Sequence, residues 1–422
     1  MQKLFEFPNG MKLVYVENSA VRSVALGVFV AAGVVTETPD ISGISHFIEH
    51  MVFKGTATRS SFDIVNQIDC IGAQINAFTS KSYTCFYTVS LDTNTVKCAD
   101  ILSDIYFNPT FDKTELERER RVVLEEINES EDTPDDICLE NLSTVFFKGH
   151  PLDKPILGNK KTLDLMTPTT LKTYMAKHYT PGNTVVSIAG NLTFDEAKRI
   201  AEKYFASKFE DIKHKEREIV TPAVLNGGFC KKKKDIEQAH IAFAFPCVSF
   251  DDERNIAVQL LTSVFGTEMS SRLFQSVRER LGLCYTIFGY PSNYENNGMF
   301  VVYTSTNPES TLKAVEAIRA EIDLLLCDGI SEEELGKGRE QLKTSLVLGQ
   351  ESTSSMMRAF GRYAIQTGKL YDFESKIAKI DSLTVDDILD VAKYIFNFDM
   401  VAGSLVSRDT KCDIMKTILK KA

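Results

Sequence analysis

The chain has 422 residues, of which 43% are hydrophobic and 25% charged, a composition typical of a globular protein with large apolar cores. Its net charge of −10 argues against nucleic acid as the main partner, because nucleic-acid binders need a basic face. No run approaches the roughly 18 apolar residues of a membrane span, and the N-terminus lacks a signal-peptide layout. Nine cysteines are scattered singly, without a CxxC pair. We therefore expect a cytoplasmic protein with no membrane partner.

The first half of the chain alternates strand-like and helix-like patterns. Pro8-Asn9-Gly10 predicts a turn between strands, and a polar turn near residues 80–82 predicts a hairpin. The expected elements, in chain order, are strands within 8–36, a helix from Gly43, a hairpin over 72–91, and helices near 94–107 and 112–131, with Pro134 interrupting after the last.

A charged segment with Pro222 and Gly227-Gly228 follows at residues 207–235 and is typical of a connector. Its lysines at 231–234 indicate a solvated linker end rather than a binding patch. The second half then repeats the order of the first half. It is expected to contain a strand at 239–250, a helix at 254–266, a hairpin region at 284–307 and a long helical stretch beyond.

The repeat predicts an α+β fold of two similar halves, each an antiparallel sheet with helices packed on one face. Helical segments 111–126 and 329–345 support the repeat, because they share spacing and pattern. The expected division is a first half at 1–210, a connector at 211–235 and a second half at 236–422.

The strongest chemical signal is His46-Phe47-Ile48-Glu49-His50. Residues four apart lie on one face of a helix, so both imidazoles can reach one metal ion, with Glu49 beside the open position. This is the order of the inverted zincins. In a chain of this length and composition, the motif arises by chance on the order of one time in a hundred. The other four histidines lack such spacing and are expected to be structural or surface groups: His150, His178, His214 and His240.

A catalytic zinc ion needs a third protein ligand, which should be acidic and lie elsewhere in the chain. The best source is the acidic helical segment 115–131. Glu119 and Glu126 are seven residues apart and therefore share a helix face. Glu126 can bind the metal while Glu119 orients a ligand histidine or the water molecule. On spacing alone, Glu125 and Glu129 are equal candidates for the third ligand.

At this point the chain resembles the pitrilysin family of metallopeptidases over almost its whole length. It is most similar to the branch that includes bacterial processing proteases and the β subunit of the mitochondrial processing peptidase. The sequence GTEMSSRLF departs from that pattern, because relatives often have a glycine-richer turn before the serines. Four segments carry the resemblance: HFIEHMVFKGT (46–56), NAFTS (76–80), RRVVLEEINESEDTPDD (120–136) and SSRLFQSVRERLGLCY (270–285).

The resemblance implies a clam-shell chamber of two halves and a zinc-dependent endopeptidase with one Zn²⁺ per chain. It selects Glu126 over Glu125 as the third ligand beside the two histidines. It also implies that Glu49 is the general base for a metal-activated water molecule. Arg278 and Tyr285 of the second half would steady the developing oxyanion or the substrate backbone.

The resemblance also implies residues that bind a peptide or unfolded polypeptide substrate. The strand with Asn76, Ala77 and Phe78 would add the peptide as a further strand, and Phe53 would line the pocket beside the cleaved bond. For both phenylalanines the alternative is core packing. Two further residues, Asp136 and Glu140, would favour a basic residue near the cleaved bond, with a solvated acidic loop as the alternative.

Three hypotheses remain at this point. The first is an active peptidase, which is also compatible with a homodimer. The second is a catalytically inactive binding or scaffold protein of the same fold. The third is a half-enzyme that needs a separate partner chain, and the presence of both the zinc motif and the Arg/Tyr motif in one chain argues against it.

Overall fold

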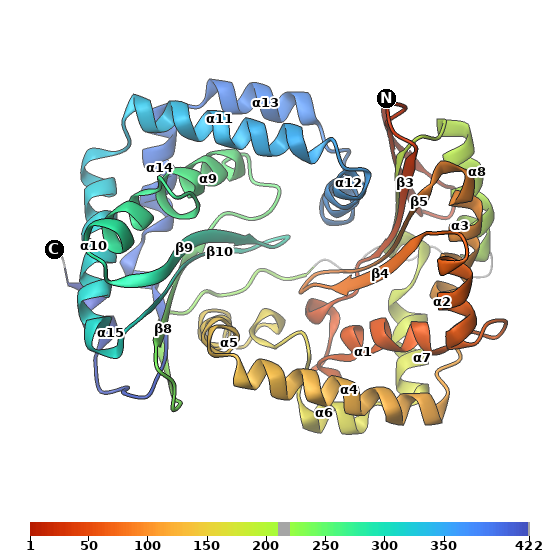
Figure 1. Cartoon of the computed structure of the whole chain (residues 1–422), viewed down its shortest axis with the longest axis horizontal. Helices are drawn as coiled ribbons and strands as arrows, with labels where there is room; N and C mark the ends of the chain where they lie inside the picture. Colours follow the sequence, from red (N-terminus) through yellow and green to blue (C-terminus); the bar gives the residue numbers. More distant parts are fainter. Residues whose placement is uncertain (210–219, 421–422) are drawn as a thin grey trace. The chain divides into compact units, whose positions relative to one another are not determined.

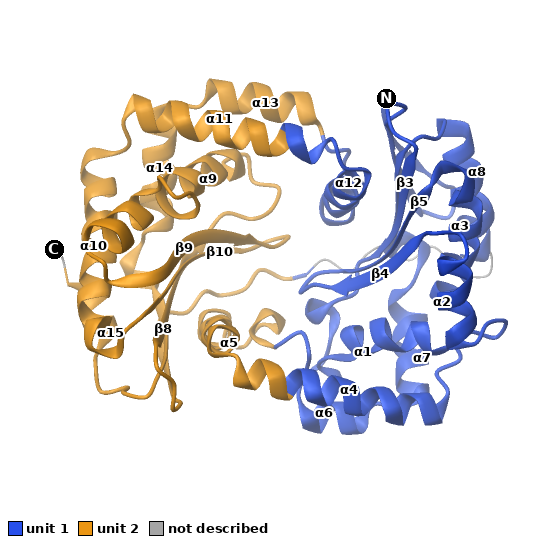
Figure 2. Ribbon diagram, viewed as in Figure 1, with its two compact units in different colours: residues 1–127, 155–220, 347–371 blue, residues 128–154, 221–346, 372–422 orange. Residues whose placement is uncertain are grey.

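The computed structural model describes residues 1–209 and 220–420, which form two compact units (Figure 2). Unit 1 consists of Met1–Ile127, Pro155–Val220 and Val347–Tyr371, and unit 2 of Asn128–Lys154, Thr221–Leu346 and Asp372–Ala422. Each unit therefore takes one segment from the other half of the sequence. Residues 210–219 lie outside the described residues. They include His214 and positions 211–219 of the expected connector.

Unit 1 is built on a six-stranded sheet. The expected hairpin over 72–91 is present, and its strand β4 lies at one end of the sheet. All neighbouring strands are antiparallel except β2 and β6, which are parallel. The strand order is β1 (Gln2–Glu6), β2 (Lys12–Glu17), β6 (Thr184–Gly190), β3 (Ser23–Val30), β5 (Thr84–Leu91) and β4 (Gln74–Thr79).

Both faces of this sheet are buried, because successive residues of a strand point to opposite sides. On one face, Leu26 and Val28 belong to the main core together with apolar residues of the helices. The other face is covered by α12 (Thr353–Thr367; Figure 1). There Phe360 of α12 packs with Phe29. The helices that contribute to the main core are α1 (Ile44–Met51), α2 (Ser61–Asp69), α3 (Thr95–Phe107), α4 (Lys113–Asp132), α6 (Lys160–Leu165), α7 (Pro168–His178) and α8 (Phe194–Tyr204).

Unit 2 repeats this plan with a five-stranded sheet. One face of this sheet packs against helices from the second half of the sequence. On the second face, α5 (Pro134–Phe146) packs on β11, β8 and β7. The strand order is β7 (Gly228–Lys233), β11 (Ala402–Ser407), β8 (Ala239–Cys247), β10 (Gly298–Thr306) and β9 (Cys284–Asn293), with only β7 and β11 parallel. The helices are α9 (Asn255–Thr262), α10 (Thr311–Asp328), α11 (Glu332–Gly349), α13 (Phe373–Ser382), α14 (Val385–Ile395) and α15 (Ile414–Leu419).

The expected α+β class with two similar halves is confirmed, but the structure corrects the expectation of antiparallel sheets with helices on one face, and that of a connector without a strand. Each sheet contains one parallel pair, and each carries a helix on its second face. The expected connector also contains strand β7, whose lysines lie at the end of the sheet, where charged side chains discourage pairing with another chain. Among the described residues, no helix is both long and apolar enough to cross a membrane.

Candidate metal centre

Helix α1 carries the predicted zinc motif and is held firmly at its start. Gly43 has a φ of 91°, and a Cβ atom there would lie 2.7 Å from the carbonyl oxygen of Leu157, so only glycine suits the position. The buried carboxylate of Glu37 accepts hydrogen bonds from the N–H groups of Gly43 (2.7 Å) and Ser45 (3.0 Å). A negative charge is stabilising at this end of a helix. The apolar face of α1 is buried in the core, which leaves the histidines on the opposite side.

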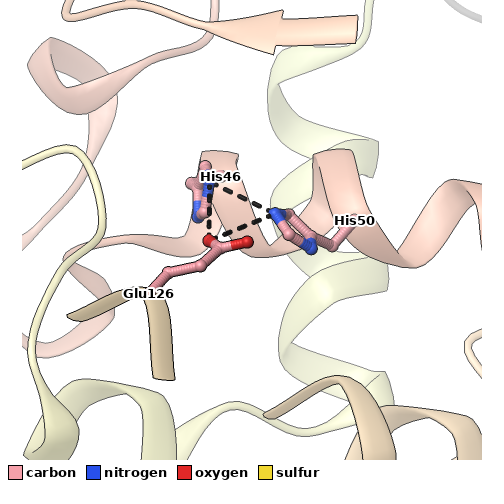
Figure 3. A group of neighbouring side chains, drawn as sticks. All are labelled: His46, His50 and Glu126. Carbon is pink, nitrogen blue, oxygen red and sulfur yellow. Dashed lines mark hydrogen bonds and ion pairs between the residues drawn. The ribbon is translucent and has the colours of Figure 1, made fainter. Parts of the chain in front are cut away.

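Three candidate ligand atoms converge between α1 and α4 (Figure 3). The Nε2 atoms of His46 and His50 lie 3.3 Å apart, and Glu126 Oε2 lies 3.6 Å and 3.5 Å from them. Zinc–ligand bonds of about 2.0–2.1 Å in tetrahedral geometry place ligand atoms about 3.3–3.5 Å apart. The residues present therefore fit one zinc ion. Glu125 and Glu129, the alternatives on spacing, are both exposed and lie outside this cluster.

The buried carboxylate of Glu119 orients one of the two histidines. His50 Nδ1 lies 2.9 Å from Glu119 Oε1, and Lys54 Nζ lies 2.7 Å from Glu119 Oε2. Because an ionised carboxylate can only accept a hydrogen bond, Nδ1 of His50 carries the proton. The lone pair of His50 Nε2 then faces the cluster. Sequence reasoning missed Lys54, because its position four residues after His50 does not predict a contact with Glu119 on another helix.

The two histidines have opposite pKa shifts. Burial, followed by the neighbouring His50, lowers the pKa of His46 to about 4, so its imidazole is neutral near pH 7. Burial also disfavours the charged form of His50. The hydrogen bond to Glu119 and the nearby carboxylates outweigh burial, however, and the pKa of His50 is raised.

Glu49 stands beside the cluster rather than in it. Its Oε2 atom accepts a 2.6 Å hydrogen bond from the hydroxyl of Thr79, the last residue of β4. Burial raises the pKa of Glu49, whereas the hydrogen bond from Thr79 opposes that rise. The position combines a partly buried carboxylate with one fixed hydrogen bond, which suits a group that exchanges protons.

The residues expected to bind substrate in unit 1 lie on β4 and just after α1. Asn76 is exposed on the terminal strand β4, and its Oδ1 atom accepts a hydrogen bond from the N–H of Ala77 (2.8 Å). Phe78 is partly buried, and its ring centroid lies 6.0 Å from that of Tyr83. Phe53 is also partly buried against the main core of unit 1. Both phenylalanines thus make the packing contacts that were their alternative role.

Unit 2 holds the remaining predicted residues, whereas the metal cluster belongs to unit 1. Arg278 lies in a π-helical segment at Phe274–Arg280, and its guanidinium carbon lies 4.9 Å from the ring centroid of Tyr285. Tyr285 is 74% exposed and lies on β9, the terminal strand of its sheet. On α5, Asp136 is exposed and Glu140 is partly buried.

The other described histidines have structural surroundings. The Nδ1 atom of His150 accepts a hydrogen bond from the N–H of Leu152 (3.2 Å). The ring of His178 lies at a tilt beside that of Tyr174 with centroids 4.5 Å apart, and His240 Nδ1 is hydrogen-bonded to the hydroxyl of Tyr303 (2.7 Å). These contacts agree with their expected structural roles.

Comparison with known sequences identifies the family. Residues 12–160 match the family model described as "Insulinase (Peptidase family M16)", and residues 166–342 match "Peptidase M16 inactive domain". The "Uncharacterized zinc protease YmxG" of Bacillus subtilis (strain 168) is 40% identical over 399 residues, which cover 94% of this chain and 97% of the relative. The chain belongs to peptidase family M16. The family expected from the motifs is therefore confirmed.

Further relatives and solved structures are similar over nearly the whole chain. An "Uncharacterized zinc protease" of Rickettsia felis is 35% identical over 390 residues, covering 92% of this chain and 93% of the relative. A protease from Helicobacter pylori superimposes with a TM-score of 0.88 at 20% identity, covering 96% of this chain and 99% of that structure. A structure from Pseudomonas fluorescens, described as a peptidase M16 inactive domain, gives 0.90 at 19% identity, covering 98% and 99%. At such identities, the structural matches establish the fold.

The two M16 matches divide the candidate residues between them. The match at 12–160 contains the metal cluster, Glu49, Glu119 and Lys54. The match at 166–342, described as inactive, contains Arg278 and Tyr285. All the groups that could bind a metal ion in this cluster thus lie in the part that matches the insulinase description.

Proposed function

We propose that this M16 protein is a zinc-dependent endopeptidase that hydrolyses peptides or unfolded protein segments. The observation that carries the proposal is the convergence of His46, His50 and Glu126 at distances suited to one tetrahedral zinc ion. The names of its relatives as zinc proteases support the choice of metal. Neither nucleic acid nor membrane is part of the proposal.

One zinc ion per chain would be held by these three side chains, which leaves a fourth coordination position open. When bound there, the ion would supply the Lewis acidity that activates a water molecule and polarises a carbonyl group. Glu119 holds His50 in the tautomer whose Nε2 lone pair faces the cluster. The chain's own residues thus provide both the ligands and the support of one ligand.

Glu49 is proposed to take a proton from water and return it to the leaving amine. Its burial raises the pKa of the carboxylic acid toward the range in which a carboxylate exchanges protons near neutral pH. The hydroxyl of Thr79 holds one carboxylate oxygen in place. Glu49 is therefore supported by the same strand that is proposed to bind substrate.

Strand β4 is proposed to bind the substrate backbone at Asn76, Ala77 and Phe78, because a terminal strand can accept an added peptide strand. Arg278 and Tyr285 are proposed to steady the oxyanion or the substrate backbone, as the family resemblance implies. One such donor typically contributes roughly 3 kcal/mol to lowering the barrier. Tyr285 is exposed and Arg278 is partly exposed beside it, so both side chains are accessible for this role.

We further propose that the protein belongs to the branch that includes the mitochondrial processing peptidase β subunit and bacterial processing proteases. A preference for a basic residue near the cleaved bond would then involve Asp136 and Glu140. Equal cleavage of library peptides with and without Arg or Lys near the bond would refute this preference.

We also propose a cytoplasmic location, which is supported by nine cysteines that are all free. The proposed assembly is a homodimer.

The experiment that tests the function combines metal analysis with cleavage of a quenched fluorescent peptide. We expect about one zinc ion per chain, cleavage that a chelator abolishes, and recovery on adding zinc. The competing hypothesis is an inactive binding protein, which the inactive-domain description of residues 166–342 favours. Full zinc loading without cleavage of a diverse peptide library would support that hypothesis instead.

A further inference from the structure

We infer that Lys54 is a positioning residue of the metal centre, acting through Glu119 on His50. This inference rests on the proposed zinc site. The three side chains form a continuous row of contacts: Lys54 Nζ lies 2.7 Å from one oxygen of Glu119, and His50 Nδ1 lies 2.9 Å from the other. Both oxygens of the carboxylate are therefore occupied by different groups, and its plane is defined by two contacts rather than one.

The surroundings of Glu119 explain why a cation is needed there. Its side chain is only 8% exposed, so water contributes little to stabilising the negative charge. A buried carboxylate with one neighbour would be free to rotate about its last bonds and would be poorly compensated. Lys54 supplies both the second contact and the compensating charge. With Lys54 present, the carboxylate of Glu119 holds the ring of His50 without adding an uncompensated negative charge beside the metal ligands.

The backbone around Lys54 is fixed relative to the start of α4, the helix that carries Glu119. Lys54 ends the short 3₁₀ helix Val52–Lys54, which directly follows α1. The carbonyl oxygen of the next residue, Gly55, accepts hydrogen bonds from the N–H and the hydroxyl of Thr110 (both 3.1 Å). Thr56 pairs with Pro109 in an isolated β-bridge. The segment after the zinc helix is thereby tied to the segment that leads into α4, which begins at Lys113.

The hydroxyl of Thr56 further anchors this segment by donating a 2.6 Å hydrogen bond to the buried carboxylate of Asp104. Lys54 is thus held on one side by α1 and on the other by the Thr56–Asp104 contact. Its long side chain has to span only the distance to Glu119, and 29% of it stays exposed. Such preorganised partners of a metal ligand commonly determine metal affinity without touching the metal.

The test measures zinc affinity by competition with a chromophoric chelator and the visible spectrum of the cobalt-substituted protein. Lys54→Met should weaken zinc binding by about 10-fold and change the cobalt spectrum, because loss of an outer hydrogen-bond partner costs roughly 10–100-fold. Lys54→Arg, which keeps charge and donors, should restore most of the affinity. The matched control is Lys113→Met, which removes the same charge from an exposed site on α4 and should leave both readouts unchanged.

A double-mutant cycle tests whether Lys54 acts through Glu119. In a Glu119→Gln background, Lys54→Met should have no additional effect on zinc affinity. Additive losses, or wild-type affinity and spectrum in Lys54→Met, would overturn the inference. Lys54→Gln is a milder second variant that keeps a donor, and it makes the same test if Lys54→Met does not fold. A wild-type protein that binds no zinc would instead contradict the proposed function itself.

Discussion

The hydroxyl of Thr79 donates a 2.6 Å hydrogen bond to the carboxylate of Glu49, joining the end of strand β4 to the helix that carries His46 and His50. This contact links residues thirty positions apart in the sequence. It opposes the effect of burial, which raises the pKa of Glu49. The pH dependence of the proposed reaction should therefore depend on Thr79.

Thr79→Val should move the acid limb of the kcat/KM profile to higher pH. Removing the donor leaves burial unopposed by that hydrogen bond, so the pKa of Glu49 rises and less of the base form remains at low pH. On the acid side we expect about a 10-fold loss of activity, with little change in zinc content, since a hydrogen bond to a charged group is worth roughly 1.5–3 kcal/mol. Thr79→Ser keeps the hydroxyl and should retain the wild-type profile. An unchanged profile in Thr79→Val would show that the hydrogen bond does not tune Glu49.

Glu49→Gln should keep zinc and fold but lose turnover by ~10²-fold or more, because the amide cannot take up a proton from water. The carboxylate of Glu49 contacts Thr79 and is not one of the three clustered ligand groups, so metal binding should survive. Metal analysis and a peptide-cleavage assay on the same preparation check both parts. Turnover close to that of the wild type would contradict the proposed role of this residue.

Glu126→Gln should weaken zinc binding far more than Glu125→Gln. Glu126 places an oxygen near both imidazole nitrogens, whereas Glu125 is exposed on the same helix and serves as the matched control. The loss should exceed the roughly 10–100-fold that removal of an outer hydrogen-bond partner costs. Chelator competition measures the difference, and equal losses in the two variants would exclude Glu126 as the third ligand.

Gly361→Ala should destabilise unit 1, because its methyl group would overlap the buried ring of Phe29 where α12 crosses the sheet. Overpacking of a filled core typically costs about 1–3 kcal/mol. The matched control is Gly336→Ala on α11, where a methyl group meets no atom within 4 Å. There the change should stabilise the helix by up to about 1 kcal/mol. Urea unfolding measures both effects, and a neutral Gly361→Ala would mean that the Phe29 ring can move aside.

Glu334→Gln should reduce the stability of unit 2 at pH 7 by on the order of 2 kcal/mol. Arg272 makes two hydrogen bonds to this carboxylate, at 2.7 Å and 2.8 Å, and lowers its pKa from the ordinary 4.5 to about 2. The stabilisation is therefore complete above pH 4.5 and is lost as the pH falls through about 2.

The difference in unfolding free energy between the wild type and Glu334→Gln should consequently shrink as the pH is lowered over this range. Glu333→Gln removes an exposed neighbour whose carboxylate pairs with Lys337, and it should cost much less than Glu334→Gln because solvent screens an exposed ion pair. A difference that stays constant from pH 7 to pH 2 would show that the Arg272 contact does not depend on the charge of Glu334.

Local spacing alone predicted much of the site. The i, i+4 histidines and the adjacent Glu49 need only a helix to face one another, and the seven-residue spacing placed Glu119 and Glu126 on one side of a second helix. The hairpin over 72–91 was predicted by alternation and a polar turn. The choice between Glu126 and Glu125 was different, because spacing within one helix does not say which side faces the other helix, and the family resemblance was needed.

Only the tertiary structure decided which distant groups meet. No local pattern encodes the Lys54–Glu119 and Thr79–Glu49 contacts or the placement of β4 at a sheet end. Nor does a local pattern show that each sheet is covered by a helix from the other half of the sequence, α12 in unit 1 and α5 in unit 2. The physical reason is that hydrophobic periodicity shows which side of a helix or strand is apolar. It does not show which other part of the chain packs against that side. Phe29 shows this: it lies in a run of mostly apolar residues, and only packing reveals that Phe360, some 330 residues later, covers its side of the sheet.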